Sequence, residues 1–202
     1  MKWLSFSEET NALDYLEQAY YYILQTKKNI NAWKWVILTL HGALYGFAIC
    51  ALKGTNLDNV TFEIKKGDKR LIDFDKALKR CQDPKWMQMT VISKNLQLSN
   101  QQNENIQILR KCFRNNFEHY VPKRWLIEIH GMPQIALDVL EVIRFLALET
   151  GNYVHLNDAQ KRRIKSIVFQ SKRNLKQSQL YKEFKLAGEK TAKRKSKFSG
   201  GR

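Results

Sequence analysis

Residues 33–52 read WKWVILTLHGALYGFAICAL, an apolar run close to the length that spans a bilayer. Lys34 lies near one end of the run and His41 near its middle, and small or hydroxylated residues dilute its hydrophobicity. A charge and a histidine inside a lone span are costly unless a partner neutralises them. The run is therefore predicted to be a central core helix, apolar on nearly all sides, and no membrane span is expected.

The segments on either side of this run favour an all-α chain. Only three prolines and nine glycines interrupt a sequence of 202 residues, 44% of them apolar. Apolar spacing and capping boxes at Ser5/Glu8 and Ser99/Gln102 indicate where helices begin. The predicted helices are 5–24, 31–53, 74–81, 84–96, 99–121, 123–146 with a break at 131–133, and 157–188. Residues 54–70 fit either a short hairpin that turns at Lys66–Asp68 or a mobile loop.

This pattern predicts one domain followed by a tail. Residues 1–156 are expected to form an up-and-down bundle of four to five core helices, with its packing order open. Residues 157–188 are expected to form an additional basic helix, and residues 189–202 a disordered basic tail.

The positive charge is concentrated at the C-terminal end. Residues 161–202 hold fifteen Lys and Arg against two Glu, so they carry +13 of the net +16 and the rest of the chain about +3. Such a tail is either a solvated terminus or a contact for nucleic acid, and the sequence leaves both alternatives open.

Other sequence features narrow the location and the chemistry. Cys50, Cys81 and Cys112 are odd in number and widely spaced, as expected for reduced thiols of a cytoplasmic protein, and no signal peptide is evident. The motifs of P-loop proteins, Rossmann folds, serine hydrolases and zinc proteases are absent from the sequence. No cofactor or metal is predicted.

One polar cluster remains as a candidate site, in the stretch RNNFEHY at residues 114–120. On a continuous α-helix, Arg114 and Glu118 share a face, as do Asn115 and His119, while the aromatic residues turn to the core. The predicted arrangement is a solvent-facing ridge of Arg, Asn and His. The guanidinium of Arg114 fits phosphate oxygens, and a neutral imidazole at His119 can accept a proton from a ribose hydroxyl. Arg124 and His130 show a similar spacing in an apolar context and are set aside.

The stretch RNNFEHY resembles the signature of the HEPN (higher eukaryotes and prokaryotes nucleotide-binding) superfamily, in which Arg and a polar residue precede His by a short gap. The context resembles a plasmid- and prophage-associated branch of ribonucleases, because a helix like residues 33–52 precedes the motif and a Pro-x-x-Trp like Pro122–Trp125 follows it. The resemblance covers roughly residues 33–151.

The resemblance implies a homodimeric, metal-independent endoribonuclease that acts as a toxin or antiphage effector, with a possible antitoxin or regulatory protein as partner. It implies Arg114, Asn115 and His119 as catalytic residues in a cleft shared by two chains, with attack by the ribose 2′-hydroxyl. His41, Glu118, Tyr120 and Lys34 are possible cleft-lining residues. The alternatives are a non-catalytic RNA-binding or dimerisation module and a membrane-associated helical protein.

Overall fold

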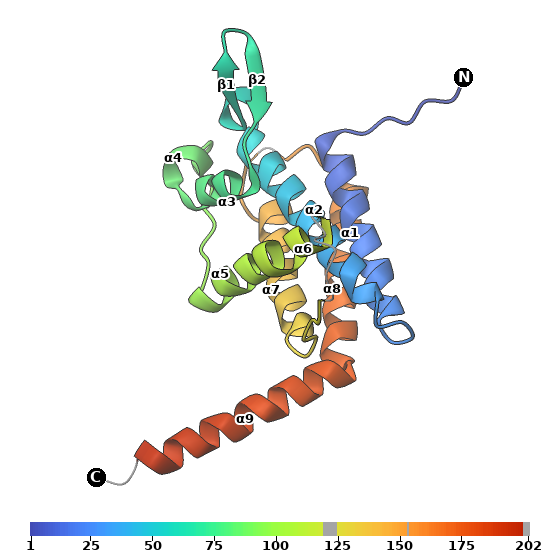
Figure 1. The fold of residues 1–202 in the computed structure, drawn as a ribbon. Coiled ribbons are helices and arrows are strands. Elements are labelled where there is room, and N and C mark those ends of the chain that lie inside the picture. Colours follow the sequence, from blue (N-terminus) through green and yellow to red (C-terminus); the bar gives the residue numbers. More distant parts are fainter. Residues whose placement is uncertain (119–124, 153, 200–202) are drawn as a thin grey trace.

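The computed structural model describes residues 1–118, 125–152 and 154–199, and side chains as far as Glu189. Helices dominate the fold, so the predicted all-α class is confirmed. Four of them enclose the core: α1 (Glu8–Gln25), α2 (Ala32–Lys53), α7 (Met132–Leu148) and α8 (Asp158–Gln177). α2 lies in the middle of this arrangement, while a β-hairpin and the last helix, α9 (Gln179–Ser199), project from opposite ends of the molecule (Figure 1).

The predicted central helix is α2, and its bounds match the sequence prediction. It begins after Asn31 and ends at Gly54, whose φ of 51° lies in the region that favours glycine. Most of its side chains are buried, among them Phe47 and Leu44 with no exposed surface. Within the described residues, α2 is the one helix long and apolar enough to cross a membrane. Of its most apolar stretch of 18 residues, 67% is buried inside the protein. That burial is the environment of a core helix.

The four core helices form two antiparallel pairs, α1 with α2 and α7 with α8 (Figure 1). α2 and α7 run in the same direction. Their C-terminal ends lie together, because Asn152, just after α7, donates to the carbonyl of Ala51 near the end of α2. α1 and α8 also run in parallel, because Tyr20 donates to Gln170 and Lys27 donates to Asn174. The bundle therefore consists of two up-and-down pairs joined by a long crossover.

The crossover between α2 and α7 holds the smaller elements. Residues 61–71 form a hairpin, one of the two alternatives left open by the sequence, with Gly67 at its turn at a φ of 91°. The elements are η1 (Leu57–Asn59), β1 (Thr61–Lys65), β2 (Asp68–Leu71), α3 (Phe74–Gln82), α4 (Pro84–Met87), α5 (Asn100–Gln107), the π-helix η2 (Ile108–Arg114) and α6 (Asn115–Glu118).

Two helix predictions in the first half of the chain need correction. The first helix is capped by Ser7 with Thr10, whereas the sequence analysis placed the capping box at Ser5/Glu8. The helix predicted for 84–96 ends at Met87. The segment that follows makes backbone hydrogen bonds to residues far away in the sequence: the N–H of Lys94 donates to Thr150 and that of Leu96 to Cys81. These hydrogen bonds replace the i,i+4 hydrogen bonds of a helix.

The helix predicted for 99–121 starts as expected, with the capping box of Ser99 and Gln102, but it is not a continuous α-helix. From Ile108 to Arg114 its turns are wider, in a π-helix, and α-helical turns resume at Asn115. A π-helix shifts the side chains that follow it relative to those that precede it on a 100° wheel, whereas the predicted shared face of Arg114 and Glu118 is confirmed by their i,i+4 ion pair.

The second half of the chain differs from its prediction at two places. The segment before Gly131 is not helical over residues 125–129, so α7 begins at Met132 with Pro133 in its first turn instead of continuing across a break. The predicted helix 157–188 is divided at Ser178, whose extended backbone ends α8 and whose hydroxyl accepts the N–H of Tyr181 in α9. α9 runs to Ser199, so residues 189–199 are helical where a disordered tail was predicted, consistent with the helix propensity of their Lys and Arg residues.

Candidate functional site

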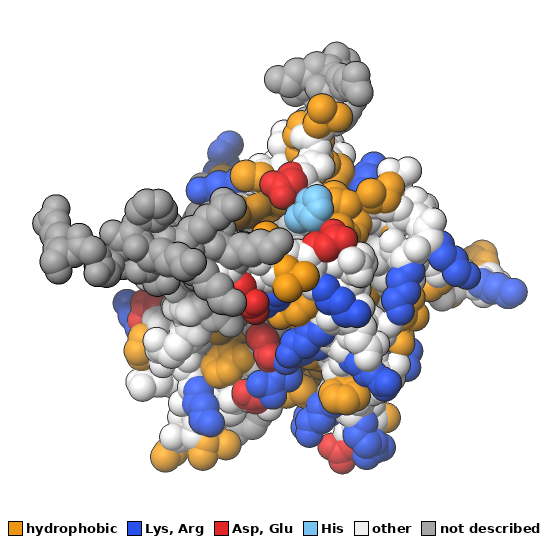
Figure 2. Space-filling view, turned by 90° about the horizontal axis from the view of Figure 1, so that it is seen from below, with side chains coloured by type: hydrophobic (Ala, Val, Ile, Leu, Met, Phe, Trp, Pro, Cys, Tyr) orange, Lys and Arg blue, Asp and Glu red, His pale blue; other side chains and the backbone are white. Residues whose placement is uncertain are grey.

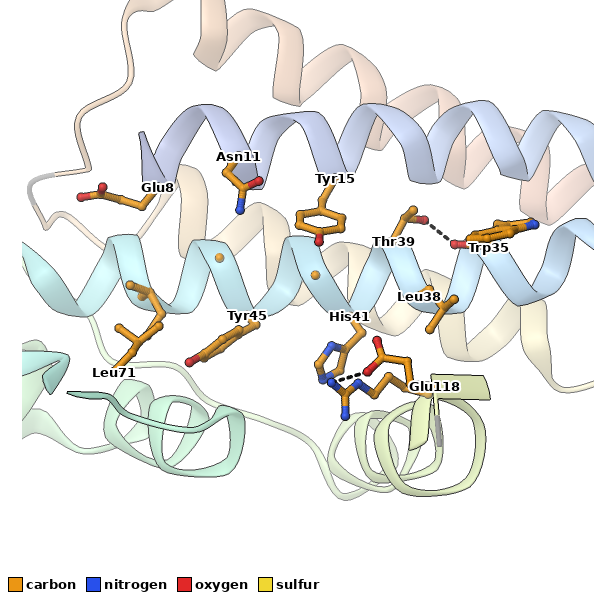
Figure 3. Close-up of a pocket in the computed structure, with 14 residues that line it drawn as sticks. Glu8, Asn11, Tyr15, Trp35, Leu38, Thr39, His41, Tyr45, Leu71 and Glu118 are labelled. Atoms are coloured by element: carbon orange, nitrogen blue, oxygen red, sulfur yellow. Dashed lines mark hydrogen bonds and ion pairs between the residues drawn. The ribbon is translucent and has the colours of Figure 1, made fainter. Parts of the chain in front are cut away.

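A cleft of about 560 Å³ opens between the α1/α2 pair and the end of the crossover segment (Figure 3). α1 contributes Glu8, Asn11 and Tyr15 to its wall, and α2 contributes His41 and Tyr45, which point toward the crossover side. The other lining residues are Trp35, Leu38, Thr39, Gly42, Gly46, Ile49, Leu71, Arg114 and Glu118. Residues far apart in the sequence therefore meet here, and they include three of the predicted site residues.

Arg114 reaches this cleft from the last turn of the π-helix. Its Nη2 lies 2.5 Å from a carboxylate oxygen of Glu118, and its Nη1 donates to Oδ1 of Asn115 at 3.1 Å. The Arg114 side chain is 29% exposed, and its Nε is buried without a hydrogen-bond partner among the described residues. Arg114 therefore lines the cleft against α2 and is partly buried instead of standing on a solvent-facing ridge, and Asn115 is half-buried beside it.

His41 lies on the α2 side of the cleft, with its ring stacked on Phe74 at a centroid distance of 4.6 Å. Burial, together with the positive charges of Arg114 and Arg110, lowers the pKa of His41 from 6.5 to about 4. The imidazole is therefore neutral at pH 7, and it presents hydrogen-bonding nitrogens rather than a second positive charge beside Arg114.

The depressed pKa of His41 predicts a specific loss of stability in acid. Between pH 6.5 and about 4 the unfolded chain binds a proton at His41 that the folded chain does not bind, so the free energy of unfolding falls as pH falls. Urea unfolding at pH 7 and pH 4.5 should show wild type losing roughly 2 kcal/mol more than His41→Gln. The exposed His155 provides a control, because His155→Gln should follow wild type. An equal loss in wild type and His41→Gln would contradict the assignment.

Two further residues of α2, Tyr45 and the predicted cleft-lining residue Lys34, have other roles. Tyr45 lines the cleft, but its hydroxyl donates to the carbonyl of Ile72, and burial and the nearby Asp73 raise its pKa. Lys34 is absent from the cleft wall, and its Nζ lies 5.2 Å from the ring centroid of Trp35 and 5.9 Å from that of Phe117. Lys34 is therefore placed by aromatic packing at the neighbouring edge of α6.

His119 and Tyr120 lie outside the described residues, as does Arg124. The position of His119 relative to Arg114 therefore rests on the sequence alone. His130, from the motif that was set aside, is exposed near Glu128 and Glu183 and does not line the cleft.

Arg110, a basic residue beside the site, was not predicted from the sequence. It lies four residues before Arg114, pairs with Asp75 at 2.7 Å and stands over the ring of Phe74 at 6.0 Å. The i,i+4 spacing of the two arginines was the available signal, but only the fold shows that His41 and Phe74 lie beside them.

The described residues contain no cluster of three or more His, Cys, Asp or Glu side chains that could hold a metal ion. The three cysteines are free, and burial raises the pKa of the Cys50 and Cys81 thiols, which are unreactive in that environment.

What this cleft can do chemically follows from its groups. Arg114 offers a fixed positive charge with a planar fork that suits phosphate oxygens, and His41 offers a neutral imidazole.

Comparison with protein-family models finds no match to this sequence, and searches among curated proteins and solved structures find none either.

Proposed function

We propose that the chain is a metal-independent endoribonuclease of the HEPN type, which cleaves RNA by attack of the ribose 2′-hydroxyl on the adjacent phosphate. The observation that carries the proposal is the placement of Arg114, from the RNNFEHY stretch, in an open cleft against the neutral His41. A nucleic acid phosphate would find there the charge and donor geometry that it needs.

In this mechanism His119 is the general base or acid for the 2′-hydroxyl and the leaving oxygen. Arg114 stabilises the negative charge that develops on the phosphorane-like transition state. The hydrogen bond between Asn115 and Arg114 orients the guanidinium, and Glu118 holds it from the other side until phosphate competes for it. The products are a 2′,3′-cyclic phosphate and a 5′-hydroxyl end.

The proposal includes a homodimer, in which the two Arg114/His119 sets face one cleft across a two-fold axis. An enzyme of this kind acts in the cytoplasm as a toxin or antiphage effector, and an antitoxin or regulatory protein restrains it.

A non-catalytic RNA-binding or dimerisation module is the second candidate. The observation that favours it is the ion pair with Glu118, because a guanidinium held by its own helix at i,i+4 is a common structural arrangement. A cleavage assay separates the two candidates.

The test uses purified protein and a single-stranded RNA in the presence of EDTA. Wild type should cleave the RNA, and His119→Ala should lose cleavage by at least about 10²-fold, because it removes the general base. His130→Ala is the matched control and should cleave as wild type does. Cleavage that requires added metal, or that survives His119→Ala, would contradict the mechanism, and intact RNA with wild type would favour the non-catalytic module.

A further inference from the structure

The outward face of α8 is unusually basic. This helix carries seven Lys and Arg side chains against one Asp, and its aliphatic side chains Ile164, Ile167, Val168 and Leu175 are buried in the bundle. Lys165, Phe169, Arg173 and Lys176 recur at i, i+4, i+8 and i+11, so they follow one another along one side of the helix over about 16 Å. Figure 2 shows Lys and Arg side chains across much of the face seen from below, with scattered Asp and Glu between them.

These residues line a groove of about 950 Å³ between α8 and the end of α7. Two of its cations are already paired: Arg144 with Glu149 at 2.6 Å and Lys172 with Glu141. The remaining three cations of the groove lie on α8 and are exposed. Within residues 1–118, 125–152 and 154–189, no carboxylate forms an ion pair with Lys165, Arg173 or Lys176.

Phe169 lies in the middle of these cations with 68% of its surface exposed. In the part of the chain whose side chains are described, no aromatic ring or cation is stacked on it. The large aliphatic side chains of α8 are buried, whereas Phe169 does not contribute to the core. Its position four residues from both Lys165 and Arg173 places an open ring face between positive charges.

We infer that this groove, here called the α8 groove, binds single-stranded RNA. Lys165, Arg173 and Lys176 contact successive phosphates, and an unstacked base lies on the ring of Phe169, the combination by which proteins hold single strands. A duplex offers phosphates but keeps its base faces stacked, so it leaves Phe169 without a partner. The α8 groove shares no lining residue with the Arg114 cleft, so it is a second contact for the strand.

Charge and burial favour this occupant over an anionic membrane surface. A helix that lies in a membrane interface inserts a continuous apolar face, whereas the apolar face of α8 is buried against α7 and α1. One exposed ring flanked by three unpaired cations matches a strand that alternates phosphates with bases. The choice of RNA over other single strands rests on the proposed function.

The test measures binding of a fluorescent 12-nucleotide oligo(U) to the full chain carrying His119→Ala, so that cleavage does not interfere. Phe169→Ala in this background should weaken binding about 5- to 150-fold, as loss of one stacked base predicts, whereas Phe169→Trp should retain it. Phe62→Ala removes an exposed ring from the hairpin and should bind like the parent. Lys165→Ala/Arg173→Ala/Lys176→Ala should reduce the salt slope by about 2, since three phosphate contacts are lost, whereas Lys65→Ala/Lys66→Ala/Arg70→Ala in the hairpin should not.

Three outcomes would overturn the inference: unchanged binding by Phe169→Ala, equally tight binding of a 12-base-pair RNA duplex, or sedimentation with phosphatidylserine vesicles that Phe169→Ala abolishes. The result is independent of the cleavage assay. Weakened binding by Phe169→Ala in a protein that never cleaves RNA would refute the proposed function and leave the α8 groove supported. RNA cleavage by wild type together with unchanged RNA binding by Phe169→Ala would support the proposed function and refute the α8 groove.

Discussion

Arg114→Ala is expected to slow RNA cleavage about 10²- to 10³-fold, the loss typical of removing one preorganised donor to a developing oxyanion. The effect should fall on kcat more than on KM, because the guanidinium matters most when charge accumulates on the phosphate. Arg114→Lys should recover only part of the rate, since a lysine keeps the charge but lacks the planar fork. The measurement is the initial rate of cleavage under saturating RNA.

Arg110→Ala is the matched control for this experiment. Arg110 is one helical turn from Arg114 and also acts on His41, but it pairs with Asp75 and does not line the cleft. It should therefore keep kcat within a few-fold of wild type. Equal losses in Arg110→Ala and Arg114→Ala would mean that general positive charge, and not a transition-state contact, is responsible.

Phe47→Ala is expected to lower the free energy of unfolding by about 3–5 kcal/mol, the range for truncating a large core aromatic. Phe47 has no exposed surface and lies in the part of α2 that packs against the other core helices. Removing its ring leaves a cavity that the surrounding helices cannot readily close. Urea unfolding monitored by circular dichroism gives the free energy.

The control for Phe47→Ala is the same substitution at Phe62, on the hairpin strand β1, where 41% of the side chain is exposed. It should cost less than about 1 kcal/mol, because little apolar surface leaves a packed environment. A comparably small loss at Phe47 would contradict the burial of α2 and would support the reading of residues 33–52 as a membrane segment.

The central helix could be predicted from the sequence because its signals agree with one another. Residues 33–52 are apolar on nearly all sides, polar groups within them are too costly for a lone span, and Gly54 provides the left-handed end. The capping boxes of Ser99 and Asn157 involve only residues three positions apart, so the starts of α5 and α8 were predictable from the sequence as well.

Elements controlled by distant contacts could not be predicted in this way. α4 stops after one turn because residues 94 and 96 bond to the backbone of Thr150 and Cys81, which only the fold brings near. The π-helix η2 has no local sequence signature, so a 100° wheel drawn through residues 99–121 misplaces the residues after η2 relative to those before it.

The candidate site was predictable in its residues and not in its arrangement. Asn115 and Glu118 lie within four residues of Arg114 in the sequence, and both contact its guanidinium. Their approach to His41, from a helix more than seventy positions earlier, depends on how the crossover segment packs against α2. Arg110 was overlooked because its role becomes visible only through its effect on the pKa of His41.

The chemical identity of the fragment ends distinguishes attack by the ribose 2′-hydroxyl from metal-dependent hydrolysis by water. Wild-type protein is incubated with a 5′-labelled single-stranded RNA in EDTA, and the upstream fragments are analysed by mass spectrometry. Attack by the 2′-hydroxyl predicts a 2′,3′-cyclic phosphate on every upstream fragment and a 5′-hydroxyl on the downstream one, with neither product formed by Arg114→Ala at comparable times. Fragments with a 3′-hydroxyl and a 5′-phosphate, or RNA that stays intact until a divalent metal is added, would contradict metal-independent cleavage by the 2′-hydroxyl.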